Sequence, residues 1–283
     1  MWLRIESFQN RRVKEAMALR KSDERRKTGR IIIDGVREIE RACEAGVVVE
    51  EVFYCPTVAT EKAKQLVEML AGRNVTILET PKRLFEKVTY GEREEGVVAI
   101  ARCPTFSLKD LTLKDGSEAP LVLVVEGIEK PGNLGAMIRT ADGAGAAAVV
   151  AADLRCDVYN PAAIRASLGT IFCLPVVAAS GAEVLEFLRQ HGLRCVAARV
   201  DGAADYFQED LTGPTAIILG SEAEGLGPVW RQDWVKSVRI PMLGRADSLN
   251  VSVAAAILLY EARRQRMVSG ASSQVQSHQS ASE

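Results

Sequence analysis

The stretch LVLVVEGIEKPGNLGAMIRTAD, residues 121–142, decides the fold. Its five leading apolar residues predict a buried strand, Leu121–Val125, and its small apolar residues predict a helix over Gly135–Ala144. A nearly all-apolar strand followed directly by a helix is typical of a parallel sheet that helices cover on both faces. Between the two elements the glycines allow a tight turn, and Asn133 is well placed to cap the helix.

The same alternation continues along the chain to about residue 268 and predicts an α/β domain over 121–268 with a mostly parallel sheet. The further strands are expected at Ala147–Ala151, Leu174–Val177, Arg194–Ala198, Thr215–Leu219 and Val238–Ile240. The further helices are expected at Pro161–Ala166, Ala182–Gln190 and Leu249–Arg266.

Residues 1–107 predict a second, smaller α/β domain. Strands are expected at Arg30–Gly35, Val47–Tyr54, Val75–Leu78 and Val97–Ala101, and helices at Val13–Arg20, Val36–Ala45, Thr60–Ala71 and Pro81–Val88. The polar stretch 108–120, which contains Asp115-Gly116-Ser117, is the expected linker. Residues 269–283 are mainly Ser, Gln, Gly and Ala, and we expect them to be disordered.

The composition limits the class of protein. The chain has 283 residues, 47% hydrophobic and 26% charged, which suits one or two globular domains. It contains no apolar run long enough to span a membrane and no secretion signal, so we expect a cytoplasmic protein. The six cysteines form no CxxC pair and only two histidines are present, so we expect no metal site and buried, reduced thiols.

The net charge of −1 argues against an obligate polyanion binder, but the charge is unevenly distributed. Between Arg4 and Arg30, ten basic residues stand against four acidic ones. Such a cluster can meet phosphates, or it can be a solvated helical face with i,i+4 ion pairs. The cluster alone does not decide between these readings.

Three loops each follow an expected strand with small and polar residues, which is where parallel α/β sheets bind ligands. After the first strand, Arg139 lies inside a small-residue helix and is either paired structurally or aimed at an anionic ligand. In the second loop, Leu219–Pro228, glycines bracket Glu222, which can accept hydrogen bonds; the alternative is a plain turn. In the third, Ile240–Ile257, Ser248 or Asn250 caps an apolar helix.

The two common nucleotide-binding signatures are missing from the sequence. It contains neither a GxGxxG fingerprint nor a phosphate-binding P-loop. An α/β enzyme that uses a nucleotide in another way is therefore the weaker alternative.

These three segments, in this order, resemble the three motifs of the SpoU-type (TrmH-like) RNA 2′-O-ribose methyltransferases of the SPOUT superfamily. The resemblance implies a trefoil knot in the second domain and S-adenosylmethionine as the cofactor. It implies that the cofactor is held by Leu219, Gly220, Ile240, Met242, Ser248 and Leu249. It assigns substrate activation to Arg139, which we expect to hold phosphate and stabilise a developing alkoxide, with orienting roles for Asn133, Glu222, Ser248 and Asn250.

Two segments of the first domain, Arg12-Val13-Lys14 and Ile33–Glu38, resemble the ribosomal-protein-like (L30e-like) substrate-binding domain common in this group. The resemblance implies RNA contacts by the basic side chains Arg11, Arg12, Lys14 and Arg37. It also implies a homodimer and methylation of a ribose 2′-hydroxyl in structured RNA, preferably 23S ribosomal RNA. A transfer RNA substrate, or a catalytically silent RNA-binding protein of ribosome assembly, is the alternative.

Overall fold

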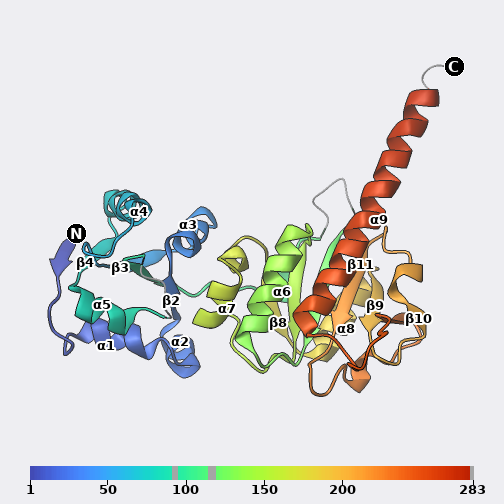
Figure 1. Cartoon of the computed structure of the whole chain (residues 1–283), viewed down its shortest axis with the longest axis horizontal. Helices are drawn as coiled ribbons and strands as arrows, with labels where there is room; N and C mark the ends of the chain where they lie inside the picture. Colours follow the sequence, from blue (N-terminus) through green and yellow to red (C-terminus); the bar gives the residue numbers. More distant parts are fainter. Residues whose placement is uncertain (91–94, 114–118, 281–283) are drawn as a thin grey trace. The chain divides into compact units, whose positions relative to one another are not determined.

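A computed structural model describes residues 1–90, 95–113 and 119–280. The chain forms two compact units (Figure 1). Met1–Thr105 and Asp157–Cys173 make up the first unit, and Phe106–Cys156 and Leu174–Glu283 make up the second. The predicted domain 121–268 therefore contains a segment, Asp157–Cys173, that packs with the first unit.

The first unit is built on a five-stranded sheet in the order β1-β4-β3-β5-β2. The strands are β1 (Trp2–Arg4), β2 (Arg30–Asp34), β3 (Val49–Tyr54), β4 (Thr76–Glu79) and β5 (Val97–Arg102). β1, β4 and β3 run parallel, whereas β5 pairs antiparallel with both β3 and β2. The sequence patterns predicted all but β1, which has only three residues and therefore no detectable alternation.

Helices cover both faces of this sheet: α1 (Arg11–Ala18), α2 (Ser22–Thr28), α3 (Val36–Glu44), α4 (Glu61–Gly72) and α5 (Lys82–Val88). In Figure 1, α1 and α5 lie on one face and α3 and α4 on the other. On the α1 and α5 side, apolar residues of both helices and of the strands form one core cluster that includes Val13, Phe53, Leu84 and Val98. The small α/β layer domain predicted for this part of the chain is thus present.

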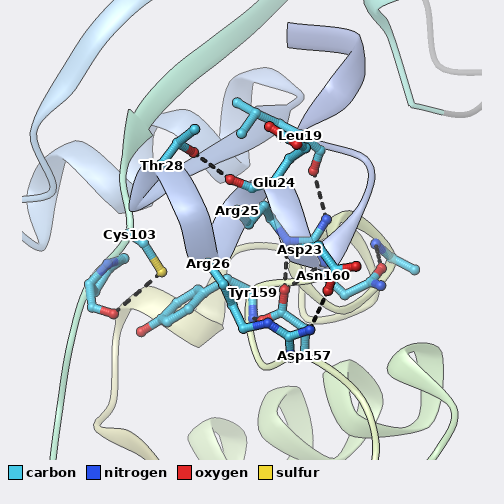
Figure 2. A network of polar contacts seen from close by, with 12 residues as sticks. Leu19, Asp23, Glu24, Arg25, Arg26, Thr28, Cys103, Asp157, Tyr159 and Asn160 are labelled. Atoms are coloured by element: carbon cyan, nitrogen blue, oxygen red, sulfur yellow. Dashed lines mark hydrogen bonds and ion pairs between the residues drawn. The ribbon is translucent and has the colours of Figure 1, made fainter. Parts of the chain in front are cut away.

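The segment Asp157–Cys173 is attached to the first unit by a buried charge pair. Arg25 is only 3% exposed, and its guanidinium donates from Nε to Oδ2 of Asp157 over 2.6 Å and from Nη1 to the carbonyl of Leu19 over 2.6 Å. Figure 2 shows Arg25 between these two partners, with Tyr159 and Cys103 beside it. The segment carries α7 (Pro161–Ala166) and the 3-10 turn η2 (Thr170–Phe172).

The second unit contains a seven-stranded sheet in the order β10-β12-β9-β11-β6-β7-β8. Its strands are β6 (Leu121–Glu126), β7 (Ala148–Ala152), β8 (Val176–Ala179), β9 (Arg194–Ala198), β10 (Ala204–Asp205), β11 (Thr215–Leu219) and β12 (Val235–Arg239). Every pairing is parallel, which confirms the predicted α/β architecture with a mostly parallel sheet. β12 begins three residues earlier than predicted, since its exposed Lys236 interrupts the apolar run.

The helices of this unit are α6 (Pro131–Gly143), α8 (Gly181–Gln190) and α9 (Val251–Ser280), with short 3-10 turns η1 (Leu108–Asp110), η3 (Tyr206–Gln208) and η4 (Pro228–Trp230). α6 and α9 lie side by side (Figure 1) and pack against each other. The strand residues of β6 and β11 are buried almost completely, so the sheet gives the loops at its ends a rigid base.

At two boundaries the structure differs from what the sequence patterns suggest. The expected linker 108–120 belongs to the second unit, because Leu111 and Leu113 are buried in its core; 114–118 lies outside the described residues. The tail expected to be disordered continues α9 to Ser280, and only 281–283 lies outside the described residues. A helix that is already formed extends without a new nucleation step, which a polar composition alone does not reveal.

The cysteines only partly follow expectation. Cys55 and Cys195 are buried as predicted, but Cys173 is exposed. Burial raises the pKa of the Cys195 thiol to about 12, so this side chain behaves as a small apolar residue. Among the described residues, no helix combines the length and apolar character that crossing a membrane requires.

Candidate active site

A cavity of about 790 Å³ lies where three neighbouring strands of the second unit end. Its wall is formed by residues that directly follow β9, β11 and β12, together with the first residues of α9. In a parallel sheet the carboxyl ends of neighbouring strands open onto the same edge, which leaves room for a ligand. The cavity is of the size that small-molecule sites occupy.

All six residues predicted to hold the cofactor line this cavity: Leu219, Gly220, Ile240, Met242, Ser248 and Leu249. They combine apolar side chains with main-chain groups of the loop after β11. A Cβ atom at Gly220 would collide with the backbone of Gly225, so the loop can fold back on itself only with glycine there. Ser221 and Gly225 close the loop through two backbone hydrogen bonds of 3.0 and 3.1 Å.

Three predicted catalytic side chains meet beside the cavity. The amides of Asn133 and Asn250 both donate to Oε1 of Glu222, the latter over 3.2 Å. Glu222 itself lines the cavity, and its Oε2 lies 3.8 Å from Nζ of Lys130. Residues from the start of α6, the loop after β11 and the start of α9 are therefore held in one polar cluster, which we call the Glu222 cluster: Lys130, Asn133, Glu222, Asn250 and Ser252.

Asn250 is fixed because it caps α9. Its Oδ1 accepts hydrogen bonds from the backbone N–H of Ser252 over 2.9 Å and from the Ser252 hydroxyl over 2.6 Å. These bonds satisfy the first turn of the helix and leave the amide nitrogen of Asn250 to reach Glu222. Of the two predicted caps, Asn250 is confirmed, whereas Ser248 faces the cavity instead.

Asn133 does not cap α6, and this prediction was wrong. The helix begins at Pro131, whose fixed φ suits the first helical position, and the capping residue is Lys130. Asn133 is thus the third residue of the helix. Its side chain is not needed for capping and is available to Glu222.

Arg139 lies apart from the cavity. It is exposed on α6, six residues beyond Asn133, which corresponds to about 9 Å along the helix axis. It does not line the cavity, and no ion pair joins it to a carboxylate within the described segments of the chain. The structural salt bridge considered from the sequence is therefore absent from that part of the structure.

Several residues at this site were missed by the sequence analysis. Arg155 donates to both Glu129 and Glu224 and so ties the loop after β6 to the loop after β11. The hydrogen bond to Glu224, and to a smaller extent the one to Glu129, raises the pKa of the Arg155 guanidinium. Nothing in the sequence around Arg155 signals such a role.

Glu126 is a second missed residue. It is 9% exposed, accepts a hydrogen bond from the N–H of Gly227 over 2.6 Å and so anchors the end of the loop after β11.

A fourth loop, which follows β9, also lines the cavity through Arg199, Val200, Asp201 and Asp205. The sequence did contain a signal for it: an expected strand ending at Ala198 is followed by Gly202 between two aspartates. Because β9 lies between β11 and β12, its end opens onto the same edge of the sheet.

The predicted RNA-binding residues of the first unit differ in their surroundings. Arg11 pairs with Glu15 of the same helix over 2.9 Å, as expected for a solvated helical face, whereas Arg12 pairs with Glu51 of β3 over 3.3 Å. Lys14 and Arg37 are exposed. The structure thus leaves two of these four side chains turned to solvent without a carboxylate among the described residues.

Known proteins resemble this chain over nearly its whole length. Residues 120–260 match the SpoU rRNA methylase family, and residues 10–99 match the MRM3-like substrate binding domain. The 23S rRNA (guanosine-2′-O-)-methyltransferase RlmB of Pseudomonas syringae is 36% identical over 208 residues, which cover 72% of this chain and 83% of that protein.

Two solved structures have the same fold. A crystal structure of an RNA 2′-O ribose methyltransferase is 42% identical, with a TM-score of 0.80, and covers 94% of this chain and 100% of its own. The SpoU methyltransferase AviRb from Streptomyces viridochromogenes, in complex with AdoMet, is 31% identical, with a TM-score of 0.81 and coverage of 92% and 99%. With its parallel sheet, strand-end cavity and ordered motifs, the chain belongs to the SpoU rRNA methylase family.

Proposed function

We propose that the protein transfers a methyl group from S-adenosylmethionine to a ribose 2′-hydroxyl of RNA, most specifically of 23S ribosomal RNA. The observation that carries this proposal is the meeting of Asn133, Glu222 and Asn250 beside a cavity lined by all six predicted cofactor residues. The relative RlmB acts on 23S rRNA, and AviRb binds AdoMet in its crystal structure.

The residues around the cavity fit this cofactor. Leu219, Ile240, Met242 and Leu249 offer apolar contact to a flat adenine ring. The backbone of the loop at Gly220 offers polar groups at close range, and the Glu222 carboxylate suits ribose hydroxyls or a positive charge. When bound, the cofactor supplies an activated methyl group on a sulfonium, so that the protein's tasks are alignment and removal of one proton.

We assign to Arg139 the task of holding an RNA phosphate and stabilising the alkoxide that develops on the ribose oxygen. A guanidinium is a reluctant base but binds phosphate oxygens through two parallel hydrogen bonds. Among the described residues that line the cavity there is no histidine, so the 2′-proton leaves to a phosphate or to water. The Glu222 cluster orients the ribose.

The position of Arg139 supports a homodimer. Within one subunit this side chain does not line the cavity, so its proposed role requires the cavity of a partner subunit. α9 presents exposed apolar side chains, among them Val253 at 46% and Tyr260 at 53%, that such a contact would cover.

We also propose the trefoil knot in the second unit. β12 lies two strands from β11, yet α9 starts directly beside α6 and β11. Residues 240–250 therefore return across the ends of β9 and β11, where the loop 220–227 already lies. A trefoil knot requires that one loop of the chain crosses another, and these two segments are the ones that we propose to cross.

The first unit is proposed as the substrate-binding domain, of the ribosomal-protein-like type, with residues 121–268 supplying catalysis apart from the segment Asp157–Cys173. Its match to the MRM3-like substrate binding domain supports this division of labour. RNA contacts by Arg11, Arg12, Lys14 and Arg37 are part of the proposal. A cytoplasmic location is part of the proposal, and a bacterial 23S rRNA substrate supports it.

The test is methyl transfer from radiolabelled S-adenosylmethionine to 23S rRNA transcribed in vitro, followed by mapping of ribose-methylated positions. We expect a defined 2′-O-methyl mark with the wild type and none with Arg139→Ala, whose affinity for S-adenosylhomocysteine should stay nearly unchanged. If the protein methylates transfer RNA transcripts but not 23S rRNA, its substrate is transfer RNA. Failure to bind S-adenosylhomocysteine in calorimetry would favour the catalytically silent protein.

A further inference from the structure

The outward sides of α1 and α5 form one surface on the first unit, which we call the α1–α5 face. Val13 of α1 and Leu84 of α5 are buried in the same core cluster, and the two helices are neighbours in Figure 1. The exposed side chains of this face are Phe8, Lys14, Arg20, Lys82, Arg83 and Lys87.

Contacts at both ends hold the two helices in register. Near the start of α5, Nη2 of Arg83 donates to the carbonyl of Glu6 over 3.4 Å, and the guanidinium lies 5.9 Å from the ring centroid of Phe8. Beyond the end of α1, Nη2 of Arg20 donates to the carbonyl of Lys87 over 2.9 Å. The face is therefore preformed, which lowers the entropic cost of binding.

Positive charge dominates the α1–α5 face. Its carboxylates are already neutralised, because Glu15 pairs with Arg11 over 2.9 Å and Glu86 with Lys82 over 3.9 Å. In the described ranges of the chain, Lys14 and Lys87 form no ion pair with a carboxylate. A surface with such an excess of cations attracts the phosphates of a nucleic acid.

Phe8 adds a second property to this charge. Its side chain is 41% exposed although it is aromatic, and the Arg83 guanidinium stands over its ring. Unpaired bases stack on exposed aromatic rings and on guanidinium planes, whereas a duplex offers its phosphates but hides the faces of its bases. The combination favours single-stranded RNA over a duplex.

We propose that the α1–α5 face binds an unpaired segment of the substrate RNA, with a base stacked on Phe8 and the neighbouring phosphates at Lys14 and Lys87. The proposal rests on the proposed function, since it names the form of RNA that the first unit recognises. It adds Phe8, Arg83 and Lys87 to the basic residues predicted from the sequence.

The experiment measures binding of the full chain to 23S rRNA transcribed in vitro, over a series of salt concentrations. The double variant Lys14→Glu/Lys87→Glu should bind at least about tenfold more weakly and show a shallower dependence on salt. Phe8→Leu should weaken binding about tenfold, while Phe8→Trp should retain it, because stacking needs a ring and not merely an apolar side chain.

The matched control is Lys62→Glu, a charge reversal of an exposed lysine on α4, which covers the other face of the same sheet (Figure 1). This variant should bind RNA like the wild type. All variants should keep the wild-type affinity for S-adenosylhomocysteine and the wild-type thermal midpoint, which shows that they fold.

The outcomes separate this proposal from the function itself. If the wild type methylates 23S rRNA and the double variant keeps its KM for RNA within about twofold, the α1–α5 face is not the binding surface. Equal competition by a duplex and by a single-stranded oligonucleotide would refute the preference for unpaired RNA. Loss of binding to ribosomal particles but not to naked rRNA would mean that the face binds protein. If the wild type methylates no RNA, the proposed function fails instead.

Discussion

The side-chain amide of Asn250 donates to the carboxylate of Glu222 over 3.2 Å, joining the start of α9 to the loop after β11. Asn133 of α6 donates to the same oxygen. The Asn250 amide also donates to Oδ1 of Asn133 over 3.5 Å, so the three side chains hold one another in place. Glu222 is thus the centre of the cluster.

From this relationship we predict that Glu222→Ala lowers kcat by about tenfold to a hundredfold, since it removes the carboxylate to which both amides donate. Glu222→Gln should retain more activity, because its carbonyl oxygen can still accept one amide. The measurement is single-turnover methylation of 23S rRNA at saturating cofactor. Wild-type turnover of Glu222→Ala would contradict an orienting role for the cluster.

The parts of this site that could be predicted are those encoded in contiguous stretches. Asn133, Glu222 and Asn250 each follow shortly after an apolar strand, so the sequence predicts that they lie at the same edge of the sheet. What could not be predicted depends on packing between distant segments. Arg155 reaches Glu129 and Glu224 only because β7 lies next to β6 and close to β11.

The same reason explains the misplaced boundaries. Asp157 belongs in sequence to the second α/β pattern, but its carboxylate is the partner of Arg25, 132 residues earlier. No local pattern reveals such a long-range pair. The assignment of Asn133 as a cap failed because two competing signals, an asparagine and Pro131, lay two residues apart and the proline prevailed.

We predict that Arg155→Met raises the KM for S-adenosylmethionine by about three- to tenfold without a change in the thermal midpoint. Its two ion pairs are exposed and add little to the stability of the fold, but both restrain the loop that carries Glu222. The measurement is the KM for cofactor alongside kcat at several salt concentrations.

The control for this variant is Arg264→Met, which removes an exposed arginine that pairs with Glu261 on the same helix and touches no loop of the site. The charge-swapped double variant Arg155→Glu/Glu224→Arg should regain part of the cofactor affinity. Equal effects of Arg155→Met and Arg264→Met would show that Arg155 does not position the loop.

The buried pair of Arg25 and Asp157 predicts a large effect on stability (Figure 2). Asp157→Ala leaves a guanidinium that is 2% exposed without its counter-charge, which should lower the free energy of unfolding by about 3 kcal/mol. Urea unfolding followed by circular dichroism gives this value.

The neighbouring ion pair of Arg26 with Asp23 serves as its control, because both side chains are more than 70% exposed. Asp23→Ala should lower the free energy of unfolding by less than about 1 kcal/mol. If the two alanine variants were equally stable, the Arg25 pair would not hold the segment Asp157–Cys173 in the first unit.

The stability of the first unit should depend on pH through Asp34. Burial raises the pKa of this carboxyl from an ordinary 3.8 to about 7. The hydrogen bond from the Tyr90 N–H and the charge of Arg165 oppose this shift, whereas the charges of Glu38 and Glu95 add to it. Between these two values the folded state keeps a proton that the unfolded chain has released. Stability is therefore greatest at the acid end of this window and falls as the pH rises to about 7.

Asp34→Asn removes the titrating group but keeps an acceptor for the Tyr90 N–H, so it should flatten this decline and stabilise the protein at pH 8. The control is Glu183→Gln. Hydrogen bonds from Ser180 lower the pKa of Glu183, so its contribution is lost only as the pH falls below about 4.5 and the variant should leave the decline between pH 5 and 7 unchanged. Free energies of unfolding at pH 5, 6, 7 and 8 for the three proteins decide the matter: a decline that persists in Asp34→Asn would assign it to another group.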